Sequence, residues 1–190
     1  MSGLIWYVCD TETTGTKSEN LYHEIVEISV IRVSDRVQIS RTIMADNPNH
    51  ASLDALRITN KTVEDLKIGI SKAQAVSDIN NFFNLDGKTP AHRCLIGHNI
   101  VSFDLRFFHE MWQSQNSQFP VNLWLDTYKL MKKYAKDAGL DKKTKLSLDA
   151  SCDLLGVKKI AKGMHSAKVD SRITIIYIKV CLILRLIIFL

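Results

Sequence analysis

The sequence predicts an α/β fold in which helices cover a mixed β-sheet, and three observations predict it. Residues 4–9 are apolar at both alternating sets of positions, which is typical of a central strand covered on both faces. Two β-branched runs then follow one another as a hairpin. Further along the chain, short apolar runs alternate with helical patterns, and this order is typical of a sheet layered with helices.

The hairpin is expected over residues 25–33 and 37–44. Both runs are rich in β-branched residues, and Ser34, Asp35 and Arg36 form a short polar break between them. A polar break of this length suits a tight turn between two antiparallel strands. Three strands are therefore expected early in the chain.

A helical pattern is expected over residues 59–83. Asn60 or Ser71 is expected to cap helices there, because both residue types accept hydrogen bonds from free amide groups at a helix start. Apolar residues recur at helical spacing in two successive stripes, namely Val63, Leu66 and Ile70, and then Val76, Ile79 and Phe83.

A strand, a turn and a helix are expected next. Residues 94–96 form a short apolar strand, and Gly97 breaks it. Residues 102–112 then form a helix, and its apolar positions fall on one side. These positions are Phe103, Phe107 and Met111.

The last predicted strand covers residues 121–125 and leads into a helix that runs through Tyr134. A Lys-rich loop follows. Ser147 is expected to cap a final helix over residues 148–155, and Gly156 is expected to end it.

Composition limits the class of protein. The chain has 190 residues and 46% hydrophobic content, which is enough for one compact domain with a substantial core. Its formal net charge of +5 fits a polyanionic partner. No signal peptide opens the chain, so a cytoplasmic location is expected.

Cysteine spacing excludes two kinds of site. No C-x-x-C pair occurs, which argues against a zinc ribbon, and the wide separation argues against a disulfide scaffold. The cysteines are expected to be small core residues in a reducing compartment. They are Cys9, Cys94, Cys152 and Cys181.

The end of the chain is unusually apolar. Residues 173–190 are interrupted only by Thr174, Lys179 and Arg185. That length is compatible with a membrane span. Two charges are costly at the centre of a bilayer, whereas a buried last helix explains the same composition. We therefore expect one domain over residues 1–174, with residues 175–190 as the end of its last helix.

Two carboxylates follow the first predicted strand directly. Since side chains alternate along a strand, Asp10 and Glu12 are expected to point the same way. Two such charges repel one another unless a cation joins them, and Mg²⁺ prefers oxygen ligands. The pair is therefore a candidate half of a metal site. The alternative is that Asp10 caps a turn and Glu12 is a solvated loop residue.

Three motifs occur in order along the chain. The first is D-T-E-T-T-G at residues 10–15, and its glycine allows backbone amides to approach a phosphate closely. The second is G-H-N-I-V-S-F-D at residues 97–104. The third is H-S-A-K-V-D at residues 165–170.

Together these motifs resemble those of the DEDDh exonucleases, the family of the proofreading subunit of bacterial DNA polymerase III. The second motif departs from the family's H-N-x-x-F-D by one extra residue between Asn99 and Phe103, and Ser171 stands where the family usually has alanine. Weaker similarity is found at residues 25–28, 125–127 and 146–150. The resemblance spans about residues 5–174.

The resemblance implies a ribonuclease H-like fold with a five-stranded mixed sheet flanked by helices. It also implies a metal-dependent 3′-to-5′ exonuclease that hydrolyses phosphodiester bonds at the 3′ end of DNA, in single strands or frayed ends. Four carboxylates would hold two divalent cations, Mg²⁺ or Mn²⁺, which can activate water and stabilise the departing oxygen. The implied metal ligands are Asp10, Glu12, Asp104 and Asp170.

His165 completes the implied catalytic set. The intrinsic pKa of a histidine lies close to neutrality, so this side chain can accept a proton from water near physiological pH. A carboxylate at position 104 would also meet the positive end of the dipole of the helix that begins there.

Further residues are expected to contact substrate. Threonines of the first motif offer backbone or hydroxyl groups to the terminal nucleotide, a histidine can hydrogen-bond a phosphate, and phenylalanines can stack on a base. For the histidine and the phenylalanines, a purely structural role is the alternative. The candidates are Thr11, Thr13, Thr14, His98, Asn99, Phe103 and Phe107.

Seven lysines gather between residues 129 and 145, against two aspartates, Asp137 and Asp141. In one interpretation they guide a phosphate backbone toward the site. In the other they form a solvated helix face. They are Lys129, Lys132, Lys133, Lys136, Lys142, Lys143 and Lys145.

Two other functions remain open at this stage. One is an RNA-trimming 3′-to-5′ exoribonuclease of the ribonuclease T type, because the motifs do not report how a 2′-hydroxyl is recognised. The other is a non-catalytic module that binds nucleic acid or associates with a polymerase, and the intact catalytic set argues against it. The expected partners are nucleic acid and a DNA polymerase or another replication or repair protein.

Overall fold

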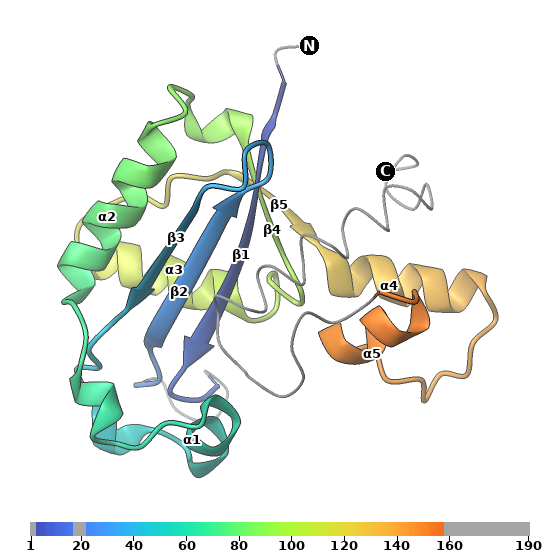
Figure 1. Ribbon diagram of the computed structural model, residues 1–190, viewed down its shortest axis with the longest axis horizontal. Coiled ribbons are helices and arrows are strands. Elements are labelled where there is room, and N and C mark those ends of the chain that lie inside the picture. The colour runs from blue at the N-terminus through green and yellow to red at the C-terminus, as the bar shows by residue number, and fades with distance from the viewer. Residues whose placement is uncertain (1–2, 17–21, 158–190) are drawn as a thin grey trace.

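The computed structural model describes residues 3–16 and 22–157, and these form a five-stranded mixed β-sheet with helices around it (Figure 1). The strand order is β3-β2-β1-β4-β5. The predicted α/β class and the five-stranded mixed sheet are confirmed. His165, Asp170 and the apolar segment 175–190 lie outside the described residues.

β1 (Ile5–Thr13) lies at the centre of the sheet, between β2 (Ile25–Arg32) and β4 (Arg93–Gly97). β2 pairs antiparallel with β1 and with β3 (Gln38–Thr42), as the hairpin pattern predicts. β4 pairs in parallel with β1, and β5 (Leu123–Asp126) pairs in parallel with β4. The three parallel strands therefore point their carboxyl ends toward the same edge of the sheet.

The alternation of side chains along β1 divides the core into two layers. Tyr7 and Cys9 point to one face and belong to the main core cluster. Val8 points to the other face and packs with Ile31 and Ile96. The strand is longer than its apolar run, because the polar residues that follow Cys9 continue to pair with β2.

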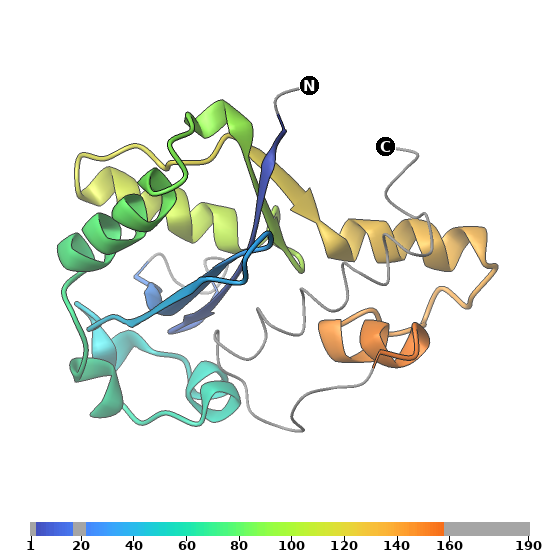
Figure 2. The ribbon, with the colours of Figure 1, turned by 45° about the horizontal axis from the view of Figure 1, so that its top comes forward.

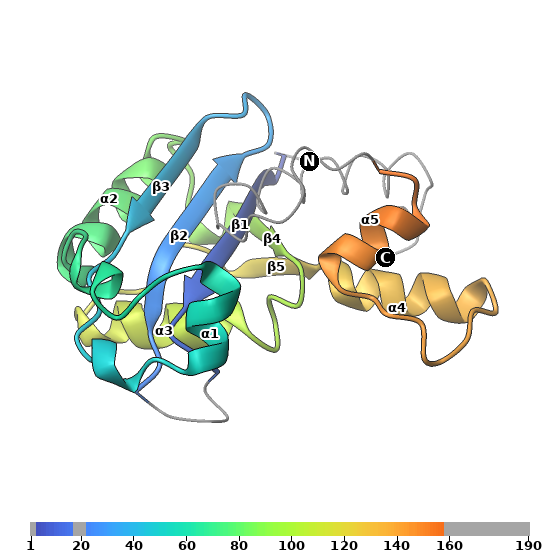
Figure 3. The same cartoon turned by 60° about the horizontal axis from the view of Figure 1, so that its bottom comes forward.

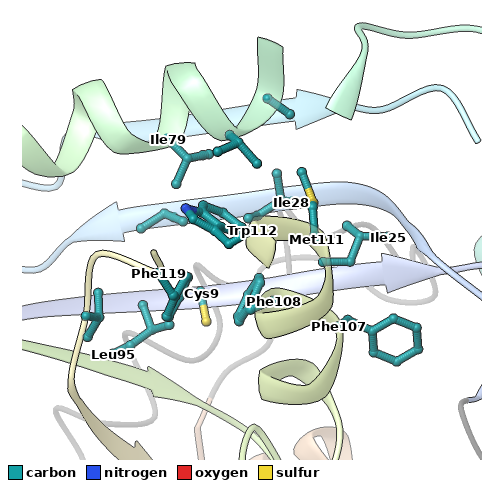
Figure 4. Packing of buried hydrophobic residues seen from close by; sticks show 14 of the residues in the cluster. Cys9, Ile25, Ile28, Ile79, Leu95, Phe107, Phe108, Met111, Trp112 and Phe119 are labelled. Carbon is teal, nitrogen blue, oxygen red and sulfur yellow. The ribbon is translucent and has the colours of Figure 1, made fainter. Parts of the chain in front are cut away.

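α2 (Lys72–Asn84) and α3 (Asp104–Ser114) cover the face that carries Tyr7 and Cys9. Figure 4 shows the apolar side of α3 turned toward the strands. Phe119 stacks on Phe108 with ring centroids 5.0 Å apart, and its edge meets Trp112 at 4.9 Å. The helical stripes predicted for these two helices are thus in the core.

The segment before α2 differs from the prediction. α1 (Leu53–Thr59) was not expected, and Asn60 ends this helix in the left-handed region instead of starting a new one. Ile70 pairs with Ile43 in an isolated bridge, so the predicted helix over residues 59–70 is wrong. Ser71 does cap α2, as expected. Three short 3-10 helices cover Pro48–His50, Asp65–Lys67 and Pro90–His92.

α4 (Thr127–Asp137) and α5 (Leu148–Leu154) lie beyond the carboxyl end of β5, away from α2 and α3 (Figure 2). Ser147 caps α5 by accepting a hydrogen bond from the amide of Ala150, and Gly156 follows its end at a φ of 66°. Both features match the prediction.

Three cysteines, Cys9, Cys94 and Cys152, are buried free thiols, as predicted, and Cys181 lies outside the described residues. Among the helices in the described ranges, none combines the length and the hydropathy needed to span a bilayer.

Candidate active site

The polar residues of the first two motifs lie at the carboxyl ends of the parallel strands. Asp10 and Glu12 are on the last part of β1, and the second motif leaves the end of β4. Ligands of open α/β sheets bind outside the carboxyl ends of parallel strands. Figure 3 shows this edge with α1 close to the end of β1 and α4 on the opposite side.

Asp10 and Glu12 occupy alternate positions on β1, opposite Ser29 and Glu27 of β2. Side chains at alternate positions share one face of the sheet, which is the arrangement that the sequence predicts. Glu12 is only 9% exposed. The carboxylates are therefore held by a rigid strand and are partly withdrawn from water.

A lysine offsets the charge next to Glu12. Glu27 lies directly across from Glu12, and two carboxylates at facing positions destabilise a sheet. Lys61 Nζ contacts Glu27 Oε1 at 2.5 Å. Sequence reasoning missed Lys61, because it follows α1 in the chain and nothing local connects it to β2.

Asp104 begins α3 and reaches back to β1. Thr11 Oγ1 donates a hydrogen bond of 2.6 Å to Asp104 Oδ1. The two residues are 7% and 6% exposed. This bond connects the first motif to the second and holds the Asp104 carboxyl beside the strand that carries Asp10 and Glu12.

Burial raises the pKa of Asp104 to about 6, with a further rise from the charge of Asp126, while the hydrogen bond from Thr11 opposes the shift. Burial also raises the pKa of the Cys9 thiol, and the charges of Asp104 and Asp10 add to that rise. Both carboxyl groups therefore lie within electrostatic range of the same buried thiol.

The described members of the predicted ligand set, Asp10, Glu12 and Asp104, carry the oxygen ligands that a hard cation prefers. Carboxylate oxygens are the ligands that Mg²⁺ prefers, and a cation would relieve the cost of a buried charge on Asp104. Within the described ranges, however, no three His, Cys, Asp or Glu side chains are grouped closely enough to hold a metal ion. The other two members of the predicted set, His165 and Asp170, lie outside those ranges.

His98 is bonded to the chain itself through both ring nitrogens. Nε2 lies 2.9 Å from the carbonyl oxygen of Leu146, and Nδ1 lies 3.0 Å from Thr127 Oγ1. Burial lowers the pKa of His98, against the opposing effects of the Leu146 carbonyl and Asp126. A neutral ring that donates from Nε2 and accepts at Nδ1 fits these contacts. The structural alternative for this residue therefore has direct support.

Asp126 organises the second motif, and sequence reasoning did not select it as a site residue. Its carboxylate accepts hydrogen bonds from the amides of Asn99 at 3.0 Å and Val101 at 3.2 Å. It also caps α4 through the amides of Tyr128 and Lys129. The sequence showed only weak family similarity at residues 125–127 and an aspartate at the end of an apolar run, which is a normal helix cap.

Asn99 adopts a φ of 68°, a left-handed conformation that asparagine tolerates better than most residues. Its carbonyl accepts hydrogen bonds from the amides of Ser102 and Phe103. This turn accommodates the extra residue that the second motif has between β4 and Asp104.

A pocket of about 240 Å³ opens beside Glu12. One wall comes from β1 and the turn after it, and α1 supplies the other. Phe103 contributes a ring at the side of Asp104. Thr11, Glu12, Thr13, Ala55, Ile58 and Thr59 are among the lining residues. Sequence reasoning missed the α1 residues because it predicted no helix there.

Thr13 and Thr14 have different surroundings. Thr13 lines the pocket, and its hydroxyl donates to the carbonyl of Gly15 at 2.8 Å. Thr14 is 2% exposed, and its Oγ1 accepts a hydrogen bond from the amide of Glu24 at 3.0 Å. The same oxygen lies 3.3 Å from Nδ1 of His23. Thr14 therefore stabilises the turn after β1.

Phe103 of the second motif and Phe107 of α3 also have different surroundings. Phe103 is partly exposed at the pocket, and its ring lies 5.2 Å from that of Phe107. Phe107 is 3% exposed and belongs to the core. A ring that contacts a base is therefore expected at Phe103.

Comparison with known protein families gives one match over most of the chain. Residues 7–177 match the family described as exonuclease, RNase_T. A curated relative, DNA polymerase III subunit epsilon of Buchnera aphidicola, is 30% identical over 180 residues. The match covers 86% of this chain and 67% of that protein.

Solved structures of exonuclease I, several of them from E. coli, share the fold. A zinc-bound complex with single-stranded DNA has a TM-score of 0.78 at 18% identity, covering 98% of this chain and 42% of that one. A product-bound form has a TM-score of 0.78 at 17% identity, covering 99% and 46%. The chain thus spans less than half of exonuclease I. The likeness confirms the expected ribonuclease H-like fold.

Proposed function

The chain belongs to the exonuclease family that residues 7–177 match, and from this premise we propose that it removes nucleotides from the 3′ end of DNA. One observation carries the proposal. The hydrogen bond from Thr11 to Asp104 joins the first two motifs beside a pocket large enough to receive part of a nucleotide. We propose DNA as the substrate because the curated relative is a DNA polymerase subunit and exonuclease I was solved with single-stranded DNA.

In the proposed mechanism, Asp10, Glu12, Asp104 and Asp170 would hold two divalent cations, Mg²⁺ or Mn²⁺. When bound, such cations lower the pKa of a water and stabilise the departing 3′-oxygen. Thr11 fixes the orientation of Asp104 through its short hydrogen bond. His165 accepts the proton of the attacking water.

The terminal nucleotide is proposed to enter the pocket between β1 and α1. The pocket has an apolar side at Ala55 and Ile58 and a partly exposed ring at Phe103. A base can stack on an aromatic ring regardless of its sequence. Thr11 and Thr13 line the same space and offer polar groups to the sugar.

The decisive test removes the proposed general base. His165→Ala is expected to fold and to bind Mn²⁺ in calorimetry, yet to hydrolyse an end-labelled DNA strand about 10²- to 10⁴-fold more slowly, since general bases contribute rates of this order. Asp10→Ala should lose both metal binding and hydrolysis. His109→Ala, an exposed histidine on α3, serves as the matched control.

A His165→Ala protein that cuts at a near-normal rate would refute the assignment of the base. Matched DNA and RNA strands of one sequence should be compared in the same assay. Faster trimming of RNA would replace DNA with RNA as the substrate.

We also propose a DNA polymerase or another replication or repair protein as partner, because the curated relative is a polymerase subunit.

A further inference from the structure

α4 carries a row of lysines that leads away from the second motif. Lys129, Lys132 and Lys136 are spaced by three and four residues, so they lie on one face of this helix, and all three are exposed. Within the part of the chain that the structure describes, none of the three forms an ion pair. By contrast, Lys133 on the neighbouring face contacts Asp137 at 2.7 Å.

The row begins at the candidate active site. Asp126 caps α4 and binds the amide of Asn99 with the same carboxylate, so the start of this helix is fixed to the second motif. The ring of Tyr128 meets the ring of His98 edge-on, with centroids 5.6 Å apart. Lys132 Nζ lies 4.7 Å from the centre of the Tyr128 ring. This cation–π contact holds one ammonium group close to the motif.

The loop after α4 brings three more lysines toward the start of that helix. The Leu146 carbonyl bonds to His98, which brings the preceding loop back to the start of α4. Three exposed lysines of that loop come with it. Asp141 uses one carboxylate oxygen to accept the amide of Lys143 within the turn. The loop lysines are Lys142, Lys143 and Lys145.

The pocket and this lysine row lie at different ends of the edge where the parallel strands end, because the pocket is beside β1 and α4 follows β5. The pocket is lined by α1, whereas the row is on α4, and Figure 3 shows these helices on opposite sides of the sheet edge. A strand whose last nucleotide fills the pocket beside β1, and which continues along this edge, passes the second motif at the end of β4 and arrives at α4. The lysine row is the surface that it then meets.

We infer that the strand upstream of the scissile bond runs along α4, with its phosphates on Lys129, Lys132 and Lys136. This inference rests on the proposed function, and it adds a direction: the 3′ end lies at α1 and the 5′ portion at α4. Lysines contact phosphates as point charges and read no base. The row therefore binds single strands without sequence preference, and longer strands bind more tightly.

Strand binding at different salt concentrations tests the inference. A protein that contacts phosphates releases counterions, and for single strands log K falls with log salt by about 0.7 per contact. Lys129→Gln, Lys132→Gln and Lys136→Gln combined should reduce that slope by about 2. Fluorescence anisotropy of 5′-labelled oligothymidylates in EDTA measures it without cutting the strand. Strands from two to about twelve nucleotides cover the usual range of site sizes.

The affinity lost in the triple variant should widen from the dinucleotide to the longest strand. Lys88→Gln is the control, since Lys88 is an exposed lysine before β4, at the opposite end of that strand from the motif. An unchanged slope in the triple variant, or an equal loss at every length, would overturn the inference. Hydrolysis of the p-nitrophenyl ester of thymidine 5′-monophosphate by the unmodified protein tests the proposed function separately, because this substrate has no upstream strand.

Discussion

A single buried threonine connects three segments around the pocket. Thr14 donates its amide to the carbonyl of Glu24 at 2.9 Å, and its carbonyl accepts the amide of Ser52 at 2.8 Å. Its hydroxyl accepts the amide of Glu24 and lies near His23. Thr14 thus joins the turn after β1 to the start of β2 and to the cap of α1.

The first prediction concerns this hydroxyl. Thr14→Val keeps the shape of the side chain but leaves the buried amide of Glu24 without a partner, which should lower the free energy of unfolding by roughly 1–3 kcal/mol. The KM for a DNA strand should rise more than kcat falls, because Asp10 and Glu12 stay on β1. Thr14→Ser retains the hydroxyl and should restore both quantities. A Thr14→Val protein with unchanged stability and KM, beside a destabilised Thr14→Ser protein, would show that the methyl group, and not the hydroxyl, matters.

Close packing requires a glycine at position 15, directly after Thr14. Gly15 has a φ of 154°, and a Cβ at this position would overlap the ring of His23. The sequence alone predicted a glycine that lets backbone approach a ligand. The structure adds close packing against a histidine eight residues further along the chain, which no local pattern reveals.

At the scale of elements, α1 and α2 begin with the same kind of cap but differ in their packing. Ser52 accepts the amide of Ala55 at 3.1 Å, and Ser71 accepts the amide of Gln74 at 3.2 Å. α2 buries five residues, whereas α1 buries none. The same substitution should therefore have different consequences in the two helices.

The second prediction compares the two caps. Ser71→Ala should lower the free energy of unfolding by about 1 kcal/mol, since α2 is part of the main core. Ser52→Ala should leave global unfolding nearly unchanged and raise the KM for DNA, because a seven-residue helix without its cap frays at the pocket wall. Urea titration and steady-state kinetics measure the two effects. A larger stability loss for Ser52→Ala than for Ser71→Ala would contradict this assignment.

The same comparison explains which elements the sequence could predict. β1, β2, α2 and α3 bury regular apolar patterns, so their residues report the fold directly. α1 has no such pattern, and Leu53 is 84% exposed. Val63, Leu66 and Ile70 have helical spacing by coincidence. They lie around a 3-10 helix whose turn is fixed by the hydrogen bonds of Asp65 to Thr62.

The candidate site was predictable where its residues are close in sequence or lie in a motif that resembles the exonuclease family. Strand alternation selected the pair Asp10 and Glu12, whereas Asp104 was selected through the resemblance of the second motif. Asp126 and Lys61 act through contacts with residues 27 and 34 positions away, respectively. Contacts of that kind depend on the folded topology, so the sequence did not report them, although residues 125–127 showed weak similarity to the family.

At the scale of the whole molecule, one buried ion pair joins four parts of the chain. Arg93 at the start of β4 contacts Asp86 at 2.8 Å, and both side chains are 1% exposed. The same guanidinium donates to the carbonyls of Phe83 and Pro120, and Tyr7 of β1 donates to Asp86 at 2.7 Å. The network therefore fixes β1, β4, the end of α2 and the segment before β5. It lies at the opposite end of β4 from the candidate active site.

Removing the charge of Asp86 should be costly because the guanidinium stays buried. Asp86→Asn leaves Arg93 without its counter-ion, and breaking a buried pair in this way typically costs about 3–5 kcal/mol. Hydrolysis of DNA below the melting temperature should change little, since the network does not contact the site. Glu64→Gln is the control, because its pair with Lys67 is exposed and contributes little.

The pH dependence of stability distinguishes the charge of Asp86 from its shape. Burial alone would raise the pKa of this carboxyl, but the hydrogen bonds from Arg93, the Lys88 amide and Tyr7 outweigh burial and hold the pKa below its usual value. The carboxylate therefore stabilises the fold above the pKa of the unfolded chain, near pH 4, and this contribution is lost as the pH falls through the folded pKa. Urea unfolding should show a large deficit for Asp86→Asn at neutral pH that shrinks steadily below about pH 4. A deficit of constant size across that range would mean that Asp86 contributes through packing and neutral hydrogen bonds, and not through its charge.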